Sequence, residues 1–431
     1  MRSGVAIQLV SRSPVGPLCF FQALAKIPVF WAEEHFRACG GSRLVRRPKG
    51  RSPERKPALL GEPRRNQDNR NVRRAARDFV TSLEGANLNR GTGASSERRV
   101  LILASPVDII GPERGKPPKV SINQKVYIIT TVFNPFNFDS RNRLYPKFAK
   151  HMAESGVELI TAEAAYGDQP FHHTSADNPF HLQVRTDQVF FHKERMINLA
   201  YAKLKHVQPD CRNIGWYDCD VSHLDPDWAG KAAHALRMYR VLQPFGEAIN
   251  LNSGDEYMWN CPSSLRAYLD KRGYHQRPPL PVIQTFQGHP GLAWMARRET
   301  LDALGGLYDR CVSSADTIMS NAFKGDVFAF VPCPPSEGMR RYMTAWQHKA
   351  NAAVQGHVGF IHGALAHHWH GPSTSRGYEK RWSIAAFHQF DPEVDLVEDP
   401  TNGMLRWAGN KPQLEQDMRM SLSLRNEDAR A

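Results

Sequence analysis

The sequence predicts an α/β fold, because runs with strand character alternate with runs of helical periodicity between residues 126 and 217. Three runs rich in β-branched, aromatic and other apolar residues have strand length: Val126–Val132, Val157–Thr161 and Ile214–Tyr217. Two segments with the apolar spacing of amphipathic helices separate them: Leu144–Glu154 and Phe190–Leu204. Strands joined through helices form parallel pairs, so this order favours an open α/β sheet.

The first strand, Val126–Val132, is predicted to be buried and to end at Asn134-Pro135, because proline cannot donate to a sheet ladder. The helix Phe190–Leu204 has a polar side that includes Lys193 and Asn198, and it leads into the third strand.

The third strand ends in two aspartates one residue apart, Asp218 and Asp220. Side chains alternate along a strand, so both carboxylates point to the same side and can share a cation. Hard divalent ions take carboxylate oxygens and keep phosphate oxygens or water as further ligands. The spacing therefore indicates a metal and diphosphate site, although acidic residues at this place can also simply begin a turn.

Polar residues also follow the other strands. In open α/β sheets, ligands bind beyond the carboxyl ends of the strands, and the polar residues at the ends of the predicted strands would gather there. These residues are Thr131, Asn134, Glu163, Asp218 and Asp220.

The positive charge of the chain is concentrated at its beginning. Residues 1–117 hold 22 Lys and Arg and 10 Asp and Glu, whereas residues 118–431 hold 34 and 33. We expect 1–117 to be a basic, low-complexity and largely disordered extension, with translation from near Val120 as an alternative. We expect 118–260 to form one ligand-binding half that ends in the two aspartates. We expect 261–431 to form a second ligand-binding half with a histidine-rich metal segment and a C-terminal helical tail.

Cysteine usage and hydropathy favour a cytoplasmic protein. The seven cysteines show no C-x-x-C spacing, which argues against a zinc ribbon or a redox pair. The apolar stretch Pro17–Trp31 is interrupted by Lys26 and is too short for a membrane span, so no transmembrane segment is predicted.

The second half contains a glycine-rich turn, Gly288-His289-Pro290-Gly291, before a short apolar run. Glycines let a backbone approach a ligand closely, so His289 and Gly291 are candidates for a sugar-facing loop, with Trp294 stacking on a sugar face. The alternative is that the glycines form ordinary turns and that Trp294 is a core residue.

Two further features of this half carry chemistry. Asp316 is expected to open a helix, where it is either a functional carboxylate or an N-cap. His362, His367, His368 and His370 form a cluster of imidazoles, and His368 and His370 would share one face of an extended segment. A three-histidine zinc site is the rival interpretation, but the sequence has no H-E-x-x-H motif.

Together these segments resemble glycosyltransferases of the GT-A fold, in particular a bacterial and phage group of family-2-like enzymes. The resemblance runs from about Lys125 to about Asp428 and implies a single Rossmann-like domain with a mixed sheet. The matching pieces are Ile129–Pro135, Glu163–Asp168, His192–Glu194, Trp216–Asp220, Gly288–Trp294, Ser314–Asp316 and His367–Gly371.

The resemblance implies a metal-dependent transfer of a hexose from a nucleotide-diphosphate sugar, with UDP-sugars favoured, to an acceptor hydroxyl. The metal, Mn²⁺ or Mg²⁺, would neutralise the departing diphosphate, and an inverting enzyme would use a carboxylate as general base. The acceptor would be a glycan, a small molecule or a hydroxymethylated DNA base. By position, the resemblance assigns the nucleotide to Thr131, Asn134, Glu163, Lys193, Asn198 and Asp218, the metal to Asp218, Asp220, His368 and His370, the acceptor or sugar to His289, Gly291 and Trp294, and the general base to Asp316.

One departure from the family pattern keeps other functions open. Relatives carry Gly-Ser-Gly-Asp followed by two histidines where this chain has Ser313–Ile318. A catalytically degenerate nucleotide- or nucleic-acid-binding protein is therefore one alternative. A metal-dependent nuclease is another, although two-metal sites usually need further carboxylates.

Overall fold

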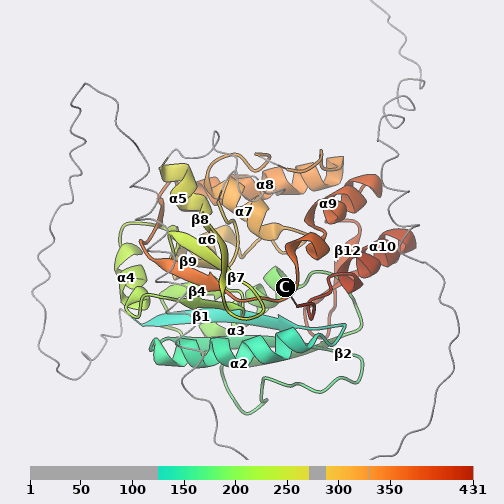
Figure 1. Ribbon diagram of the computed structural model, residues 1–431. Coiled ribbons are helices and arrows are strands. Elements are labelled where there is room, and N and C mark those ends of the chain that lie inside the picture. The colour runs from blue at the N-terminus through green and yellow to red at the C-terminus, as the bar shows by residue number, and fades with distance from the viewer. Residues whose placement is uncertain (1–124, 271–287, 330, 431) are drawn as a thin grey trace, which may run out of the picture. The chain divides into compact units, whose positions relative to one another are not determined.

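The computed structural model describes residues 125–270, 288–329 and 331–430, and the extension predicted for residues 1–117 lies outside them. Two sheets and a hairpin organise these residues (Figure 1). The seven-stranded sheet has the order β10-β6-β9-β4-β1-β2-β3, and the four-stranded sheet has the order β5-β11-β7-β8. The strands are β1 (Val126–Phe133), β2 (Glu158–Tyr166), β3 (His181–Thr186), β4 (Asn213–Tyr217), β5 (Val221–His223), β6 (Val241–Gln243), β7 (Glu247–Leu251), β8 (Tyr257–Pro262), β9 (Ala293–Arg297), β10 (Val358–Phe360), β11 (Ala364–His367), and the hairpin β12 (Leu396–Glu398) and β13 (Leu405–Trp407).

The helices connect these strands and extend beyond them. They are α2 (Asp139–Glu154), α3 (Lys193–Val207), α4 (Trp228–Ala235), α5 (Ser264–Leu269), α6 (Arg298–Leu304), α7 (Ala315–Phe323), α8 (Glu337–Val354), the 3₁₀ turn η6 (Ser373–Arg376), α9 (Tyr378–Phe387) and α10 (Pro412–Ser423). Among the described residues, no helix combines the length and the apolar character needed to cross a bilayer.

The large sheet mixes strand directions. β1 pairs in parallel with β2 and β4, whereas β9 runs antiparallel between β4 and β6. The predicted α/β class with a mixed sheet is therefore confirmed. Strands from both predicted halves of the chain build this one sheet, because β9 and β10 come from residues beyond 260.

β1 is buried on both faces, as its continuous apolar sequence predicts. Tyr127 and Ile129 point into the cluster that includes α3, while Val126 and Ile128 point into the cluster that includes α2 and α4. This period of two fixes the direction of every side chain along the strand. The polar residues that follow β1 and β4 are thereby placed at one edge of the sheet.

The C-terminal segment returns to the middle of the fold (Figure 1). Both carboxylate oxygens of Asp428 accept hydrogen bonds from the first turn of α2, at 3.0 Å from Asp139 N and 2.7 Å from Ser140 N. The backbone of Asn426 and Glu427 packs so closely on Gly371 that a Cβ there would lie 2.6 Å from Asn426 O. The tail is consequently part of the wall that surrounds the carboxyl edge of the sheet.

Candidate functional site

A cleft lies at the carboxyl ends of β1 and β4, and its volume is about 1210 Å³ when its open mouth is included. The enclosed part of the cleft measures about 160 Å³. The cleft is lined by Thr131, Phe133, Arg141, Phe191, Lys193, Asp218, Cys219, Asp220, His289, Pro290, Gly291, Leu292, Ser314, Asp316, Thr317, Pro332, His367, His370, Arg376, Tyr378, Glu379, Arg381, Trp382 and Arg425.

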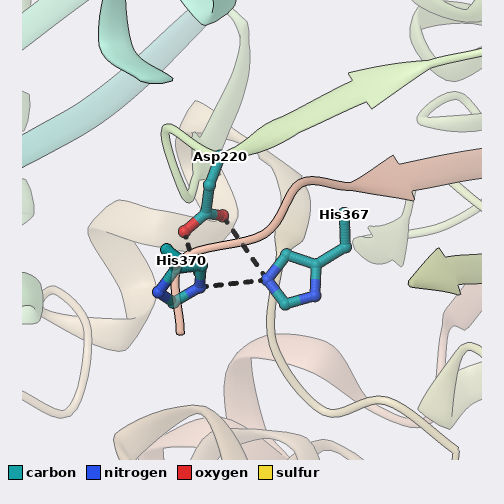
Figure 2. Close-up of side chains that lie close together, drawn as sticks. All are labelled: Asp220, His367 and His370. Atoms are coloured by element: carbon teal, nitrogen blue, oxygen red, sulfur yellow. Dashed lines mark hydrogen bonds and ion pairs between the residues drawn. The ribbon is translucent and has the colours of Figure 1, made fainter. Parts of the chain in front are cut away.

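One carboxylate and two imidazoles meet in this cleft. Asp220, His367 and His370 each turn one ligand atom inward, and these atoms lie within 4.8 Å of one another (Figure 2). His370 Nε2 is 3.1 Å from Asp220 Oδ2, and His367 Nε2 is 3.8 Å from Asp220 Oδ1. We refer to these three residues as the Asp–His cluster.

Strand pairing explains why residues so distant in sequence meet. β11 pairs antiparallel with β5, which places His367 opposite Val221, the residue after Asp220. His368 N also donates a 2.8 Å hydrogen bond to Asp220 O, which fixes the turn that carries His370.

The Asp–His cluster has the chemistry of a divalent cation site. Asp220 Oδ1 is buried and lacks a hydrogen-bond partner among the described residues, so it is free to accept a cation. His367 Nδ1 lies 2.8 Å from Asn250 Oδ1, and a donated bond there leaves Nε2 unprotonated and directed at Asp220. Burial lowers the pKa of both His367 and His370 well below the usual value and keeps the imidazoles neutral, as metal ligands must be. Burial, followed by the charge of Asp218, raises the pKa of Asp220 to about 6, and a bound cation would counter that effect.

Arg141 connects the Asp–His cluster to the C-terminal tail. Its Nη1 lies 3.5 Å from Asp220 Oδ2, and its Nη2 lies 3.4 Å from His370 Nδ1. The same guanidinium donates two hydrogen bonds to Glu427, of 2.5 Å from Nε and 2.9 Å from Nη2. Glu427 therefore holds the guanidinium of Arg141, which would otherwise be free to compete with a metal ion for Asp220.

A second chain of charges crosses the cleft. Lys193 Nζ is 2.7 Å from Asp218 Oδ1 and 3.0 Å from Asp316 Oδ2, so one buried ammonium bridges two carboxylates. Burial alone would lower the pKa of Lys193, but Asp218 and Asp316 raise it well above its usual value. Asp218 is thus engaged by Lys193 and lies outside the Asp–His cluster.

Asp316 lies in the first turn of α7, as the sequence predicts, and faces the cleft. Burial raises the pKa of its carboxyl group, while Lys193 opposes that effect. The backbone of Gly291 passes so close that a Cβ there would be 3.0 Å from Asp316 Oδ2. A carboxylate with a raised pKa at the wall of a cleft is suited to accept a proton from a bound hydroxyl.

Other predicted ligand residues serve the surrounding structure. Asn134 accepts from Phe138 N and donates to Phe138 O, each at 2.9 Å, and so closes the turn before α2. Glu163 accepts from the backbone of His172 and His173 and from Thr174 Oγ1, at distances from 2.6 to 3.3 Å.

Asn198 and Trp294 also lie outside the lining of the cleft. Asn198 bonds the backbone of Leu307 in both directions, at 2.8 and 3.1 Å, and joins α3 to the segment after α6. Trp294 is 1% exposed, stacks on Trp216 and donates to Pro290 O at 2.8 Å. Trp294 therefore lies in the core, as the alternative interpretation of the sequence held. Thr131, His289 and Gly291 do line the cleft.

The expected pairing of His368 with His370 is not what the structure shows. β11 ends at His367, so the extended segment that would place His368 and His370 on one face stops before them. His368 instead turns to Ser222 Oγ and Asp255 Oδ1, at 3.0 and 3.1 Å from its two ring nitrogens. The imidazole that joins His370 beside Asp220 is that of His367.

Sequence reasoning did not assign His367 to the metal, and it gave no site role to Arg141 or to the cleft-facing residues Arg376, Arg381 and Arg425. His367 belongs to the histidine run that the sequence pointed out, and only the end of the strand decides which imidazole turns inward. The arginines have no local pattern that distinguishes them from solvated charges.

Comparisons with known proteins return structural neighbours alone. No protein-family model matches the sequence, and no curated protein is similar to it at a significant level. The catalytic domain of Drosophila β1,4-galactosyltransferase 7 in complex with xylobiose aligns over 68% of this chain and 98% of its own, with a TM-score of 0.32 and 9% identity. A mutant of the same enzyme with manganese, UDP-Gal and xylobiose has a TM-score of 0.30, 10% identity and the same coverage. A putative nucleotide-diphospho-sugar transferase from Desulfovibrio desulfuricans aligns over 70% of this chain and 97% of its own, with a TM-score of 0.23 and 10% identity. At these TM-scores the alignments assign no activity to this chain, and the functional argument rests on the cleft.

Proposed function

We propose that this protein is a metal-dependent glycosyltransferase that moves a hexose from a nucleotide-diphosphate sugar to an acceptor hydroxyl. The observation that carries the proposal is that the Asp–His cluster and Asp316, bridged by Lys193 to Asp218, line the same cleft at the carboxyl edge of the sheet. A cation site and a half-buried carboxylate base in one cleft are what this reaction requires.

On the donor side, Asp220, His367 and His370 would hold Mn²⁺ or Mg²⁺. A mixed carboxylate and imidazole set suits Mn²⁺ in particular, since Mg²⁺ prefers oxygen ligands. The bound ion would supply Lewis-acid neutralisation of the diphosphate leaving group. Thr131 and Asp218, which line the cleft at the ends of β1 and β4, would contact the nucleoside, and we favour a UDP-sugar as donor.

On the acceptor side, Asp316 would accept the proton of the attacking hydroxyl. The hydroxyl oxygen forms its bond to the anomeric carbon as the bond from that carbon to the diphosphate oxygen breaks, which inverts the anomeric centre. Lys193 holds the Asp316 carboxylate in place, and His289 and Gly291 form the neighbouring wall.

The acceptor class is a glycan or small-molecule hydroxyl, or a hydroxymethylated DNA base. The near-neutral charge of residues 118–431 favours the first class. The basic residues 1–117 favour the second, because Lys and Arg supply sequence-independent affinity for phosphates.

The test is hydrolysis of a panel of nucleotide sugars with Mn²⁺ or EDTA by the native chain, Asp220→Asn and Asp255→Asn. Asp255 is a matched control, because it is a half-buried aspartate that pairs with His368 and Lys147 and does not belong to the lining of the cleft. We expect slow Mn²⁺-dependent release of nucleoside diphosphate from one donor, lost in Asp220→Asn and kept in Asp255→Asn. Turnover that survives in Asp220→Asn, or no binding of any donor, would contradict the proposal.

Asp316→Asn separates catalysis from binding. We expect transfer to fall by a factor of about 100 or more while donor affinity stays within about threefold, because a general base acts on the acceptor. Unchanged transfer would remove Asp316 from the mechanism, and Mn²⁺-dependent cleavage of DNA by the native chain would favour a nuclease instead.

A further inference from the structure

Three arginines from the C-terminal part of the chain line the cleft together with Tyr378. Arg376 ends η6, Arg381 lies in α9, and Arg425 follows α10. All three belong to the lining that also contains Asp220, and we call them the arginine cluster.

The arginine cluster is built by contacts between its members and their neighbours. Arg381 is 1% exposed, its Nε donates to Ser313 Oγ at 3.1 Å, and its guanidinium lies 5.2 Å from the ring centre of Tyr378. Arg376 Nη1 donates to Tyr378 Oη at 3.4 Å. Tyr378 is thus held between two guanidinium groups.

The positive charge of the arginine cluster is poorly balanced. Glu427 Oε1 lies 2.8 Å from Arg425 Nε, but the same carboxylate is also bound by Arg141. Arg376 Nε is buried, and no hydrogen-bond partner for it exists among the described residues. Burial and the nearby charge of Arg425 lower the pKa of Arg381 to about 10, and Arg376, Arg425 and Arg381 hold the pKa of Tyr378 below its usual value despite burial. Arg381 and Arg425 are buried and Arg376 is half-buried, and the carboxylates that act on them, Glu427 and Asp220, are shared with Arg141. Guanidinium groups in this state favour binding of a further anion.

We propose that Arg376, Arg381 and Arg425, with Tyr378, form a phosphate-binding subsite that works without the metal. Guanidinium forks match phosphate oxygens, and the phenol adds a hydrogen-bond donor. The subsite shares a cleft with Asp220, so it is placed to hold a phosphate group beside the ion. The phosphate has two possible sources, the diphosphate of the donor and a phosphate group of the acceptor. This inference rests on the proposed function only because that function supplies the donor diphosphate.

The experiment measures binding of inorganic pyrophosphate to the full chain in EDTA by calorimetry. It compares the native protein with Arg376→Gln, which changes a half-buried residue, with Arg425→Gln, and with Arg341→Gln as control. Arg341 is exposed on α8 and pairs with Asp391 and Glu393 away from the cleft. We expect pyrophosphate affinity to fall at least tenfold in Arg376→Gln and Arg425→Gln and to stay unchanged in Arg341→Gln. Thermal melting confirms that each variant is folded, and a folded Arg376→Gln keeps the inference testable if Arg425→Gln does not fold.

Absence of pyrophosphate binding by the native chain in EDTA, or equal affinity in native and folded Arg376→Gln protein, would overturn the subsite. If UDP binds with Mn²⁺ while pyrophosphate does not bind in EDTA, the subsite fails and the proposed function stands. If pyrophosphate binds in EDTA while no nucleotide sugar binds with Mn²⁺, the subsite stands and the proposed function fails. Saturating UDP in EDTA then identifies the source: displacement of pyrophosphate assigns the subsite to the donor, and simultaneous binding assigns it to an acceptor phosphate.

Discussion

Replacing Glu427 by Gln removes the charge that holds Arg141 beside the Asp–His cluster. The native carboxylate is 3% exposed and receives two hydrogen bonds from Arg141 as well as a contact from Arg425. Despite burial, which would raise it, the charges of Arg141 and Arg425 lower the pKa of Glu427 to about 2. The variant leaves buried guanidinium groups without their shared counter-ion.

The size of the effect follows from that pKa. Against an ordinary value of 4.5, a folded-state pKa of about 2 corresponds to roughly 3 kcal/mol of stability. Removing one partner of a buried ion pair typically costs about 3–5 kcal/mol, so the two routes agree. Because the pKa is lowered on folding, this stabilisation is present above the ordinary value and is lost as the pH falls through the folded value. The difference between native and variant should therefore be about 3 kcal/mol near pH 7 and about half of that near pH 3.

Urea unfolding of native, Glu427→Gln and Glu299→Gln protein across this pH range measures the effect. Glu299 forms an exposed pair with Arg297 at 3.1 Å, and its loss should change the free energy of unfolding by less than about 1 kcal/mol. A Glu427→Gln variant as stable as the Glu299→Gln control, or a difference that does not shrink in acid, would refute the reasoning.

Two further predictions concern the cleft. His367→Ala should weaken Mn²⁺ binding by a factor of about 10–100, whereas His368→Ala should change the Mn²⁺ affinity by no more than about threefold, because only His367 of the two turns toward Asp220. Mn²⁺ titration followed by electron paramagnetic resonance measures both affinities, and equal losses in the two variants would contradict the prediction. Gly291→Ala should lower kcat about tenfold with little change in KM or melting temperature, because its Cβ would lie 3.0 Å from Asp316 Oδ2 and displace that carboxylate. Steady-state kinetics with the donor that the nucleotide-sugar panel identifies provides the measurement, and an unchanged kcat would place the reacting groups elsewhere.

Local sequence patterns were enough to predict several strands and helices of the fold. The run Val126–Val132 becomes β1, and the turn residues Asn134-Pro135 follow its end. The helix that Asp316 was expected to open becomes α7. These features follow from side-chain periodicity and from residues that stop a strand or begin a helix, and both act over a few neighbouring positions. β3 (His181–Thr186) was not predicted. Leu182 and Val184 do alternate with Gln183 and Arg185, but two apolar residues are too few to distinguish a strand from a loop.

The sequence by itself determined the alternation of strands and helices, the two aspartates after β4 and the presence of imidazoles near residue 370. Only the tertiary structure decided which of these groups meet. The pairing of β11 with β5 brings His367 to Asp220, while Lys193 on α3 forms an ion pair with Asp218, which lies outside the Asp–His cluster. The returning tail adds Glu427 and the arginine cluster to the cleft. The physical reason is range: periodicity fixes which way a side chain points from its own element, whereas proximity between elements depends on the pairing and packing of segments that are distant along the chain.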